Sequence, residues 1–220
     1  MAALSARLLA LAGAALALSG CLSFARFDSP RTVPAGSREV LFAPSVYLGR
    51  SDGNAINTDV IIRNGVAGRA DLGFRFNLLS GTADLKLQLV RASDPSRGVD
   101  LAVAPLVGYG SDTSWQGSSG SSDQDSWNWY VGLPVLVGIN LGRYQLVVTP
   151  QLLYQRVAFL PDGIFDLGGT VAFGKVAGSG FAVYPVVAVW KALDARQPLT
   201  SLRGPGALAV QPALVFRWGP

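Results

Sequence analysis

Histidine is absent from the sequence, and cysteine occurs once, at Cys21. Without histidine the chain cannot form the Ser-His or Cys-His pairs of nucleophilic catalysis. It also lacks the usual ligand of catalytic zinc and iron sites. A lone cysteine cannot close an intrachain disulfide, so no covalent cross-link is expected to stabilise the fold. We therefore predict a protein that is not an enzyme and that holds no cofactor and no metal.

Long charged side chains are scarce as well. Only 15% of the residues are charged, against about 25% in ordinary soluble domains. Glu39 is the single glutamate, and the three lysines are Lys86, Lys175 and Lys191. Such side chains normally cover the surface of a soluble protein, whereas the short polar groups and arginines found here suit a crowded polar interior. The net charge of +4 is scattered without a basic run, so nucleic acid is not an expected partner.

Long apolar runs are missing beyond the N-terminus, which predicts no membrane-spanning helix. The first twenty residues contain Arg7, an apolar run over 8–18 and small residues before Cys21. This pattern predicts a secretory signal peptide over 1–20, because the run is shorter than the roughly 20 residues that span a bilayer. Residues 21–36 are polar and contain Pro30 and Pro34, which predicts an N-terminal tether.

The rest of the chain, 37–218, alternates between polar and apolar residues with a period of two. In "RYQLVVTPQLLYQR" (143–156) one face carries tyrosines, leucines and valines, and the other carries mostly glutamine, threonine and arginine. About ten such segments of ~9–12 residues predict strands long enough to cross a membrane. The fold class is then all-β, an antiparallel up-and-down transmembrane β-barrel of about ten strands. Prolines inside several strands remove ladder donors, and we expect bulges or kinks there.

The two faces can be assigned from their charge. The apolar rows contain almost no charged residues and end in aromatic residues, as in the girdles of membrane barrels. The predicted girdle consists of Tyr109, Trp127, Trp129, Tyr144, Tyr154, Trp190, Phe216 and Trp218. The opposite rows are expected to hold a network of charges in the lumen, formed by Asp59, Arg63, Asp71, Arg75, Asp84, Lys86, Asp100, Arg143, Asp166 and Arg217. A barrel of this size is expected to have a filled or very narrow lumen.

The predicted loops contain few residues suited to catalysis or to metal binding. Asp123 and Asp125 lie in a Ser/Gly-rich stretch, which is typical of a solvated loop with at most weak attraction for Ca²⁺. One alternative architecture stays open: a soluble periplasmic, lipocalin-like lipoprotein whose apolar rows face inward and carry a hydrophobic ligand.

Three motifs resemble those of a known class of proteins. "LSGC" (18–21) resembles the lipobox of bacterial lipoproteins, "PALVFRW" (212–218) is similar to the assembly signal of outer-membrane barrels, and "GVAGRADLGFRF" (65–76) looks like their hairpins. The chain thus resembles small bacterial outer-membrane β-barrel proteins carrying a lipoprotein signal peptide. The alternative for the N-terminus is an ordinary signal peptide with a coincidental cysteine.

The resemblance implies acylation of Cys21, for example with palmitate, and forwarding to the outer membrane of a Gram-negative cell, because Leu22 replaces the aspartate that favours inner-membrane retention. Outer-membrane lipids and the barrel-assembly machinery would be its partners, and any surface ligand is unknown. The expected role is structural, surface-interacting or that of a narrow pore.

Overall fold

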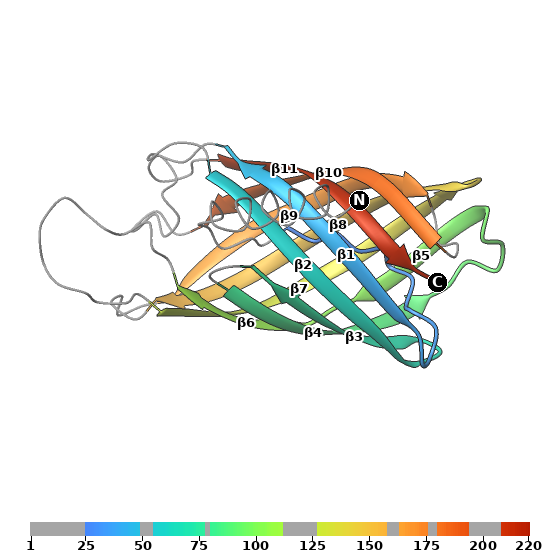
Figure 1. The fold of residues 1–220 in the computed structure, drawn as a ribbon. Helices are drawn as coiled ribbons and strands as arrows, with labels where there is room; N and C mark the ends of the chain where they lie inside the picture. Colours follow the sequence, from blue (N-terminus) through green and yellow to red (C-terminus); the bar gives the residue numbers. More distant parts are fainter. Residues whose placement is uncertain are drawn as a thin grey trace, which may run out of the picture.

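The computed structural model describes residues 25–48, 55–77, 80–111, 127–157, 163–175, 180–193 and 208–220. They form an antiparallel sheet of eleven strands that closes on itself through the β3–β4 pairing (Figure 1). The strands are β1 (Arg38–Tyr47), β2 (Ala55–Ala67), β3 (Ala70–Phe76), β4 (Ser80–Val90), β5 (Arg97–Val103), β6 (Leu106–Ser111), β7 (Trp127–Leu141), β8 (Tyr144–Val157), β9 (Ile164–Lys175), β10 (Gly180–Ala192) and β11 (Leu208–Gly219). No helix in these ranges is long and apolar enough to cross a membrane.

The wall has ten strand positions, because β5 and β6 share one of them. Both pair with β4 on one side and β7 on the other. Only Ala104 and Pro105 separate them, and Ala104 N donates a hydrogen bond to Pro134 O of β7 at 3.0 Å. All other strands pair with their neighbours in the sequence, and β1 pairs with β11. The predicted up-and-down barrel of about ten strands is therefore confirmed.

Bulges or kinks were expected at the prolines within the strands, and the expected bulges are not found. The register is the same on both sides of Pro105, Pro134, Pro150 and Pro212. The described ladders shift register only at Gly65/Ala67 and Gln88/Val90. A proline omits one hydrogen bond locally, and the long ladders on either side keep the strands aligned.

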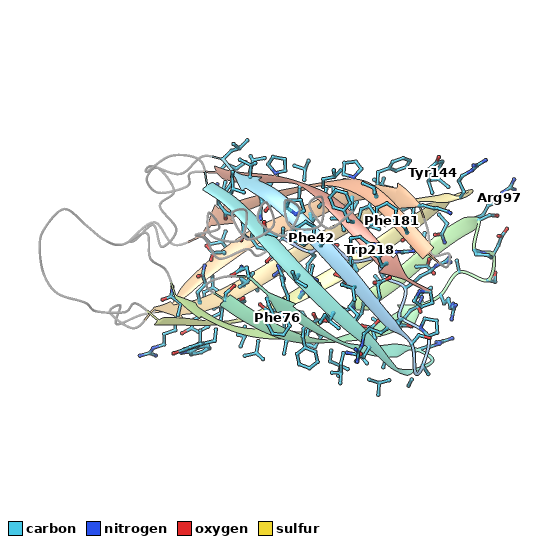
Figure 2. The ribbon with its side chains drawn as sticks, in the orientation of Figure 1. Phe42, Phe76, Arg97, Tyr144, Phe181 and Trp218 are labelled. Carbon is cyan, nitrogen blue, oxygen red and sulfur yellow. The ribbon has the colours of Figure 1, made fainter. Side chains whose placement is uncertain are left out.

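Side chains alternate between the two faces of the wall, and the apolar set points outward (Figure 2). On β3 Leu72, Phe74 and Phe76 are exposed, whereas Asp71 and Arg75 on the opposite face are buried. An apolar exterior around a charged interior is the reverse of a soluble barrel. It contradicts the lipocalin-like alternative, in which the apolar rows would enclose a ligand.

Most of the outward aromatic residues gather toward the two ends of the barrel, whereas Phe42 lies between them (Figure 2). Near the end with the long connections, Trp129 and Tyr154 lie 5.8 Å apart between ring centroids. At the other end Phe181 packs against Trp218 at 5.2 Å and Tyr144 stacks on Phe173 at 5.4 Å. Other residues predicted for the girdle also face outward, namely Tyr109 and the half-buried Phe216. The side chain of Trp127 lies outside the described residues.

Trp190 was wrongly assigned to this girdle. It points into the barrel and is 3% exposed. Its indole lies flat against Gly168 of the neighbouring strand, where an added Cβ would be 2.0 Å from Trp190 Cε3. Only glycine leaves room for the ring against the wall at this position.

Candidate functional site: the filled lumen

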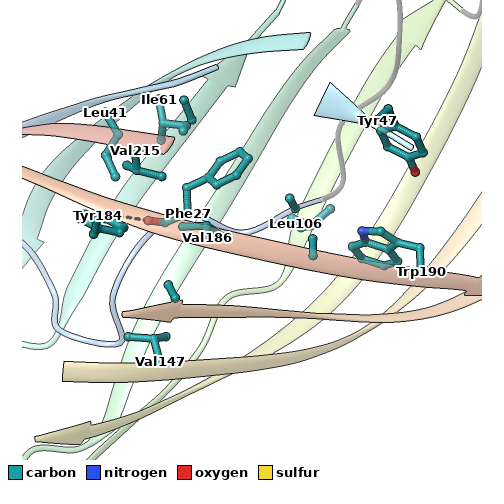
Figure 3. Packing of buried hydrophobic residues seen from close by; sticks show 14 of the residues in the cluster. Phe27, Leu41, Tyr47, Ile61, Leu106, Val147, Tyr184, Val186, Trp190 and Val215 are labelled. Carbon is teal, nitrogen blue, oxygen red and sulfur yellow. Dashed lines mark hydrogen bonds between the residues drawn. The ribbon is translucent and has the colours of Figure 1, made fainter. Parts of the chain in front are cut away.

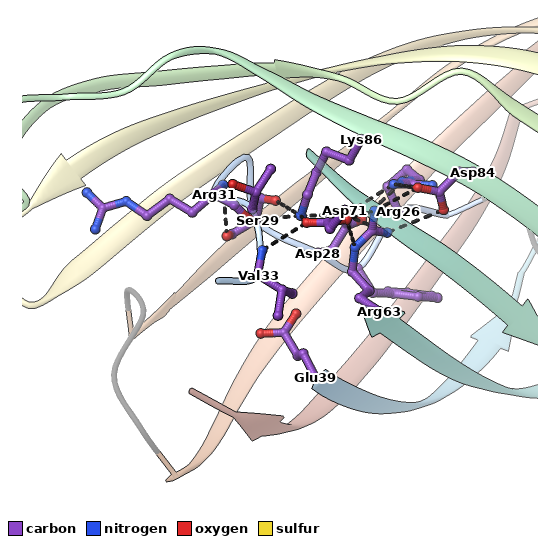
Figure 4. A network of polar contacts seen from close by, with 12 residues as sticks. Arg26, Asp28, Ser29, Arg31, Val33, Glu39, Arg63, Asp71, Asp84 and Lys86 are labelled. Carbon is purple, nitrogen blue, oxygen red and sulfur yellow. Dashed lines mark hydrogen bonds and ion pairs between the residues drawn. The ribbon is translucent and has the colours of Figure 1, made fainter. Parts of the chain in front are cut away.

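The lumen is occupied by the N-terminal segment of the chain itself. Residues 25–34, called the plug below, run through the interior of the barrel (Figures 3 and 4). They join the wall at the end with the short turns, where Gly36 is hydrogen-bonded to Gly65. Ala25, Arg26, Phe27, Asp28 and Val33 are each at most 6% exposed. The sequence predicts a polar tether over 21–36. Residues 25–33 are instead buried or half-buried inside the barrel, whereas 34–36 are exposed. Residues 21–24 lie outside the described residues.

A tight turn connects the plug to the wall. Ser37 N donates to Pro34 O at 2.9 Å, and Gly36 adopts a φ of 76°. A positive φ at the third position is typical of a type II turn, which favours glycine there. The turn is fixed to β2, because Gly36 N donates to Gly65 O at 3.0 Å and Gly65 N donates to Ser37 O at 3.0 Å.

Three cations and three carboxylates meet where the plug passes β2, β3 and β4 (Figure 4). From the plug, Arg26 pairs with Asp28 at 3.0 Å and with Asp84 of β4 at 3.0 Å. Asp28 also forms an ion pair with Arg63 of β2 at 3.1 Å and lies 3.3 Å from Lys86 of β4. The plug and the wall therefore share one ionic network.

The wall completes this network. Arg63 pairs with Asp84 at 2.7 Å and makes a very short contact with Asp71, and Lys86 lies 3.3 Å from Asp71. Each of these charges is at most 6% exposed. Buried charges are tolerated only when they are paired and hydrogen-bonded, and every member here has at least two opposite charges within 3.3 Å.

Wall side chains also satisfy the plug's backbone. Lys86 Nζ donates to the carbonyl oxygens of Ser29 and Arg31 at 2.9 and 2.8 Å. Val33 N donates to Asp71 Oδ2 at 2.9 Å, and Arg75 Nη1 donates to Ala25 O at 2.7 Å. Because these groups would otherwise be buried without partners, the contacts hold the plug at a fixed depth.

A second polar group lies nearer the short-turn end. Arg31 Nε donates to Asp100 Oδ2 at 2.8 Å. The same carboxylate accepts from Asn140 Nδ2 at 3.1 Å and Gln145 Nε2 at 3.0 Å. Thr32 Oγ1 lies 3.2 Å from Gln88 Oε1, so both sides of the barrel hold this part of the plug.

Phe27 gives the plug an apolar anchor on the opposite wall. It is 2% exposed and belongs to a cluster with Leu41, Ile61, Val186 and Val215 (Figure 3). Tyr184 Oη donates to Phe27 O beside this cluster. Burial of a phenylalanine side chain contributes about 1.5–3 kcal/mol.

Glycines on the inner wall leave space for the plug. A Cβ on Gly65 would lie 2.0 Å from Pro34 O, and one on Gly138 would lie 2.6 Å from Pro30 Cγ. Two gaps border the plug, with volumes of about 20 and 10 Å³. A water molecule needs about 10–15 Å³, so each gap is about the size of one water molecule.

Nine of the ten charges predicted for the lumen face inward and are buried, namely Asp59, Arg63, Asp71, Arg75, Asp84, Lys86, Asp100, Asp166 and Arg217. Arg143 is the exception, because it lies exposed in the two-residue turn between β7 and β8. Gly142, the other turn residue, has a φ of 70°. The sequence analysis missed Arg26, Asp28 and Arg31, which supply the plug's share of the network. Cys21, Asp123 and Asp125 lie outside the described residues.

Within the described ranges, no group of three or more Cys, Asp or Glu side chains is placed to hold a metal ion. The fold and the lumen together define a closed antiparallel β-barrel that has an apolar exterior and is filled by its own N-terminal segment.

Comparisons with known proteins add fold-level similarity only. No protein-family model matches the chain, and no curated protein matches it. Among solved structures, Neisserial surface protein A is similar, with 10% identity over 83% of this chain and 95% of that chain and a TM-score of 0.38. OmpT, an outer membrane protein of Vibrio cholerae, has 10% identity over 83% of this chain and 97% of that one, with a TM-score of 0.29.

Proposed function

We propose that this chain is an integral outer-membrane β-barrel whose lumen is closed at rest by its own plug. Its role is that of a non-catalytic scaffold carrying the connections at the end opposite the short turns. The observation that carries the proposal is the pairing of an apolar exterior with a charged, filled interior. Such a surface is stable only against lipid, and the filled interior supports a barrel that does not conduct at rest.

The outward apolar residues cover the whole height of the wall. Leu85, Val107, Leu133, Val171 and Val187 are between 38% and 54% exposed. Apolar surface removed from water contributes ~25 cal/mol per Å² to the free energy of transfer. Covering a band of this kind with lipid therefore stabilises the barrel by far more than the few kcal/mol of a single contact. The aromatic groups at both ends support a position spanning the bilayer, with rings at the level of the headgroups.

Membrane fractionation followed by gel electrophoresis with and without boiling tests this proposal. Recovery in the outer membrane and a mobility shift that depends on boiling are expected, because a closed barrel resists SDS until it is heated. Release of the chain by an alkaline wash, without a shift, would contradict integral insertion. Reconstitution of the full chain in a planar bilayer is expected to give no current steps.

Acylation of Cys21 is part of the proposal and needs its own test. Growth with an alkyne analogue of palmitate should label the wild-type chain and leave Cys21→Ala unlabelled. The boiling-dependent shift should persist in Cys21→Ala, because the strands and not the acyl chains hold the barrel in the membrane. Absence of label from the wild type would favour an ordinary signal peptide.

A further inference from the structure

The buried charges of the wall do not balance. Among the described residues, four cations (Arg63, Arg75, Lys86 and Arg217) and six carboxylates (Glu39, Asp59, Asp71, Asp84, Asp100 and Asp166) point into the lumen and are at most 9% exposed. Their formal sum is two negative charges.

The plug has the opposite sign. Arg26 and Arg31 bring two positive charges and Asp28 one negative charge, and all three pair with charges inside the lumen. The net positive charge of the plug therefore offsets half of the wall's excess. Such complementarity stabilises the plug in place, and its withdrawal would leave a lumen that repels anions and attracts cations.

Withdrawal of the plug would leave the hydrogen bonds between the strands intact. Within the described residues, each hydrogen bond between the plug and the wall has a side chain as its donor or its acceptor, as from Val33 N to Asp71 and from Lys86 to Ser29 O. Backbone pairing with β2 begins only at Ala35 and Gly36, beyond the plug. Removing residues 25–34 therefore breaks no hydrogen bond of the barrel ladder.

We propose that the lumen is a narrow pore for small cations that the plug holds closed, and that displacement of the plug opens it. This inference rests on the proposed function, since conduction requires a barrel that spans a membrane. It adds a solute class and a closing element to that function. Charged side chains lining a pore set its preference for cations or anions.

Deletion of residues 25–34 from the otherwise full chain tests the inference in planar bilayers under a KCl gradient. The boiling-dependent shift of each variant is measured first, to establish that the barrel is closed. The full chain is expected to show no steps, and the folded deletion variant is expected to show steps with a reversal potential of the sign that indicates K⁺ over Cl⁻. A folded deletion variant without current, or with a preference for Cl⁻, would overturn the inference and leave the membrane barrel intact.

Two further variants complete the design. Asp84→Asn in the deletion background should move the reversal potential toward zero, and Arg143→Gln, which alters an exposed turn, should leave it unchanged. If the deletion variant shows no boiling-dependent shift, the conductance of the full-length double variant Arg26→Gln/Asp28→Asn is measured in its place. Brief current steps from its folded barrel would support a displaceable plug. A folded double variant that never conducts would overturn the inference. Loss of the shift in the wild-type chain would instead refute the proposed function.

Discussion

Replacing Gly65 by alanine is expected to destabilise the plugged barrel, because the new methyl group would collide with the backbone of the plug. Its Cβ would lie 2.0 Å from Pro34 O and 2.6 Å from Val33 O. Ordinary van der Waals contact begins at 3.4 Å, so the backbone must move by about 1.4 Å, the difference between that limit and the shorter distance. The obstacles are backbone atoms, so rotation of a side chain cannot relieve the collision.

The magnitude follows from the cost of overpacking. Inserting a methyl group into a packed site typically costs 1–3 kcal/mol, and we take about 2 kcal/mol for Gly65→Ala. In a chain of this size each kcal/mol corresponds to roughly 2–4 °C in the unfolding midpoint. The expected decrease is therefore about 4–8 °C.

The assay is the temperature at which half of the protein acquires the mobility of the boiled form. Gly68→Ala is the matched control, because it lies three residues away and a Cβ there meets nothing within 4 Å. Its midpoint should equal that of the wild type. Equal midpoints for Gly65→Ala and Gly68→Ala in the full chain would refute the described position of the plug.

Three other substitutions are informative. Asp28→Ala removes a buried carboxylate that faces three cations and should cost about 3 kcal/mol in the free energy of unfolding; Asp94→Ala, in an exposed turn, is its control and should change stability little. Gly168→Ala should move the indole of Trp190 off the wall, which is measured as a change in near-UV circular dichroism; an unchanged spectrum would contradict the flat packing. Leu85→Lys on the outer face should cost about 2–4 kcal/mol for a barrel in lipid vesicles, whereas an unchanged denaturant midpoint would argue against lipid contact.

The architecture could be predicted from the sequence because the strands have two unlike environments. On β8, Gln145, Thr149 and Gln151 are buried while Tyr144 and Leu152 are exposed, as the alternation predicts. A shift of one residue would turn every side chain of such a strand to the wrong face, so the pattern fixes both the face and the register.

Prediction failed where a strand is apolar on both faces. β10 carries Val183, Val187 and Val189 outside and Tyr184 and Val186 inside. Its inner row is apolar because it packs against Phe27, so no alternation separates the two sides. The misplacement of Trp190 on the same strand has this origin.

The plug could not be predicted because its contacts connect distant parts of the chain. Arg26 meets Asp84 across 58 positions and Tyr184 meets Phe27 across 157. A short polar segment with two prolines has no periodicity that would reveal such partners. Composition alone made a tether the simplest interpretation.

The hydrogen bonds of the buried amide side chains differ between the two ends of the lumen. Near the short-turn end, Gln88 meets Thr32, and Gln145 donates to the Asp100 carboxylate that Arg31 also holds.

Beyond the point where Arg26 N reaches Thr170, toward the other end, the pattern changes. Among the described residues, Asn57 Nδ2, Asn128 Oδ1 and both polar atoms of the Gln151 side chain are buried and meet no hydrogen-bond partner. A buried polar group left unpaired costs about 1–3 kcal/mol. The wall satisfies other amides by itself, since Gln145 Nε2 donates to Asn140 Oδ1 at 2.9 Å and Asn140 Nδ2 donates to Asp100 Oδ2 at 3.1 Å. At the short-turn end the plug adds Thr32 beside Gln88 and Arg31 on the Asp100 carboxylate. Displacing the plug would break these polar contacts, so their loss is part of the free energy of displacement.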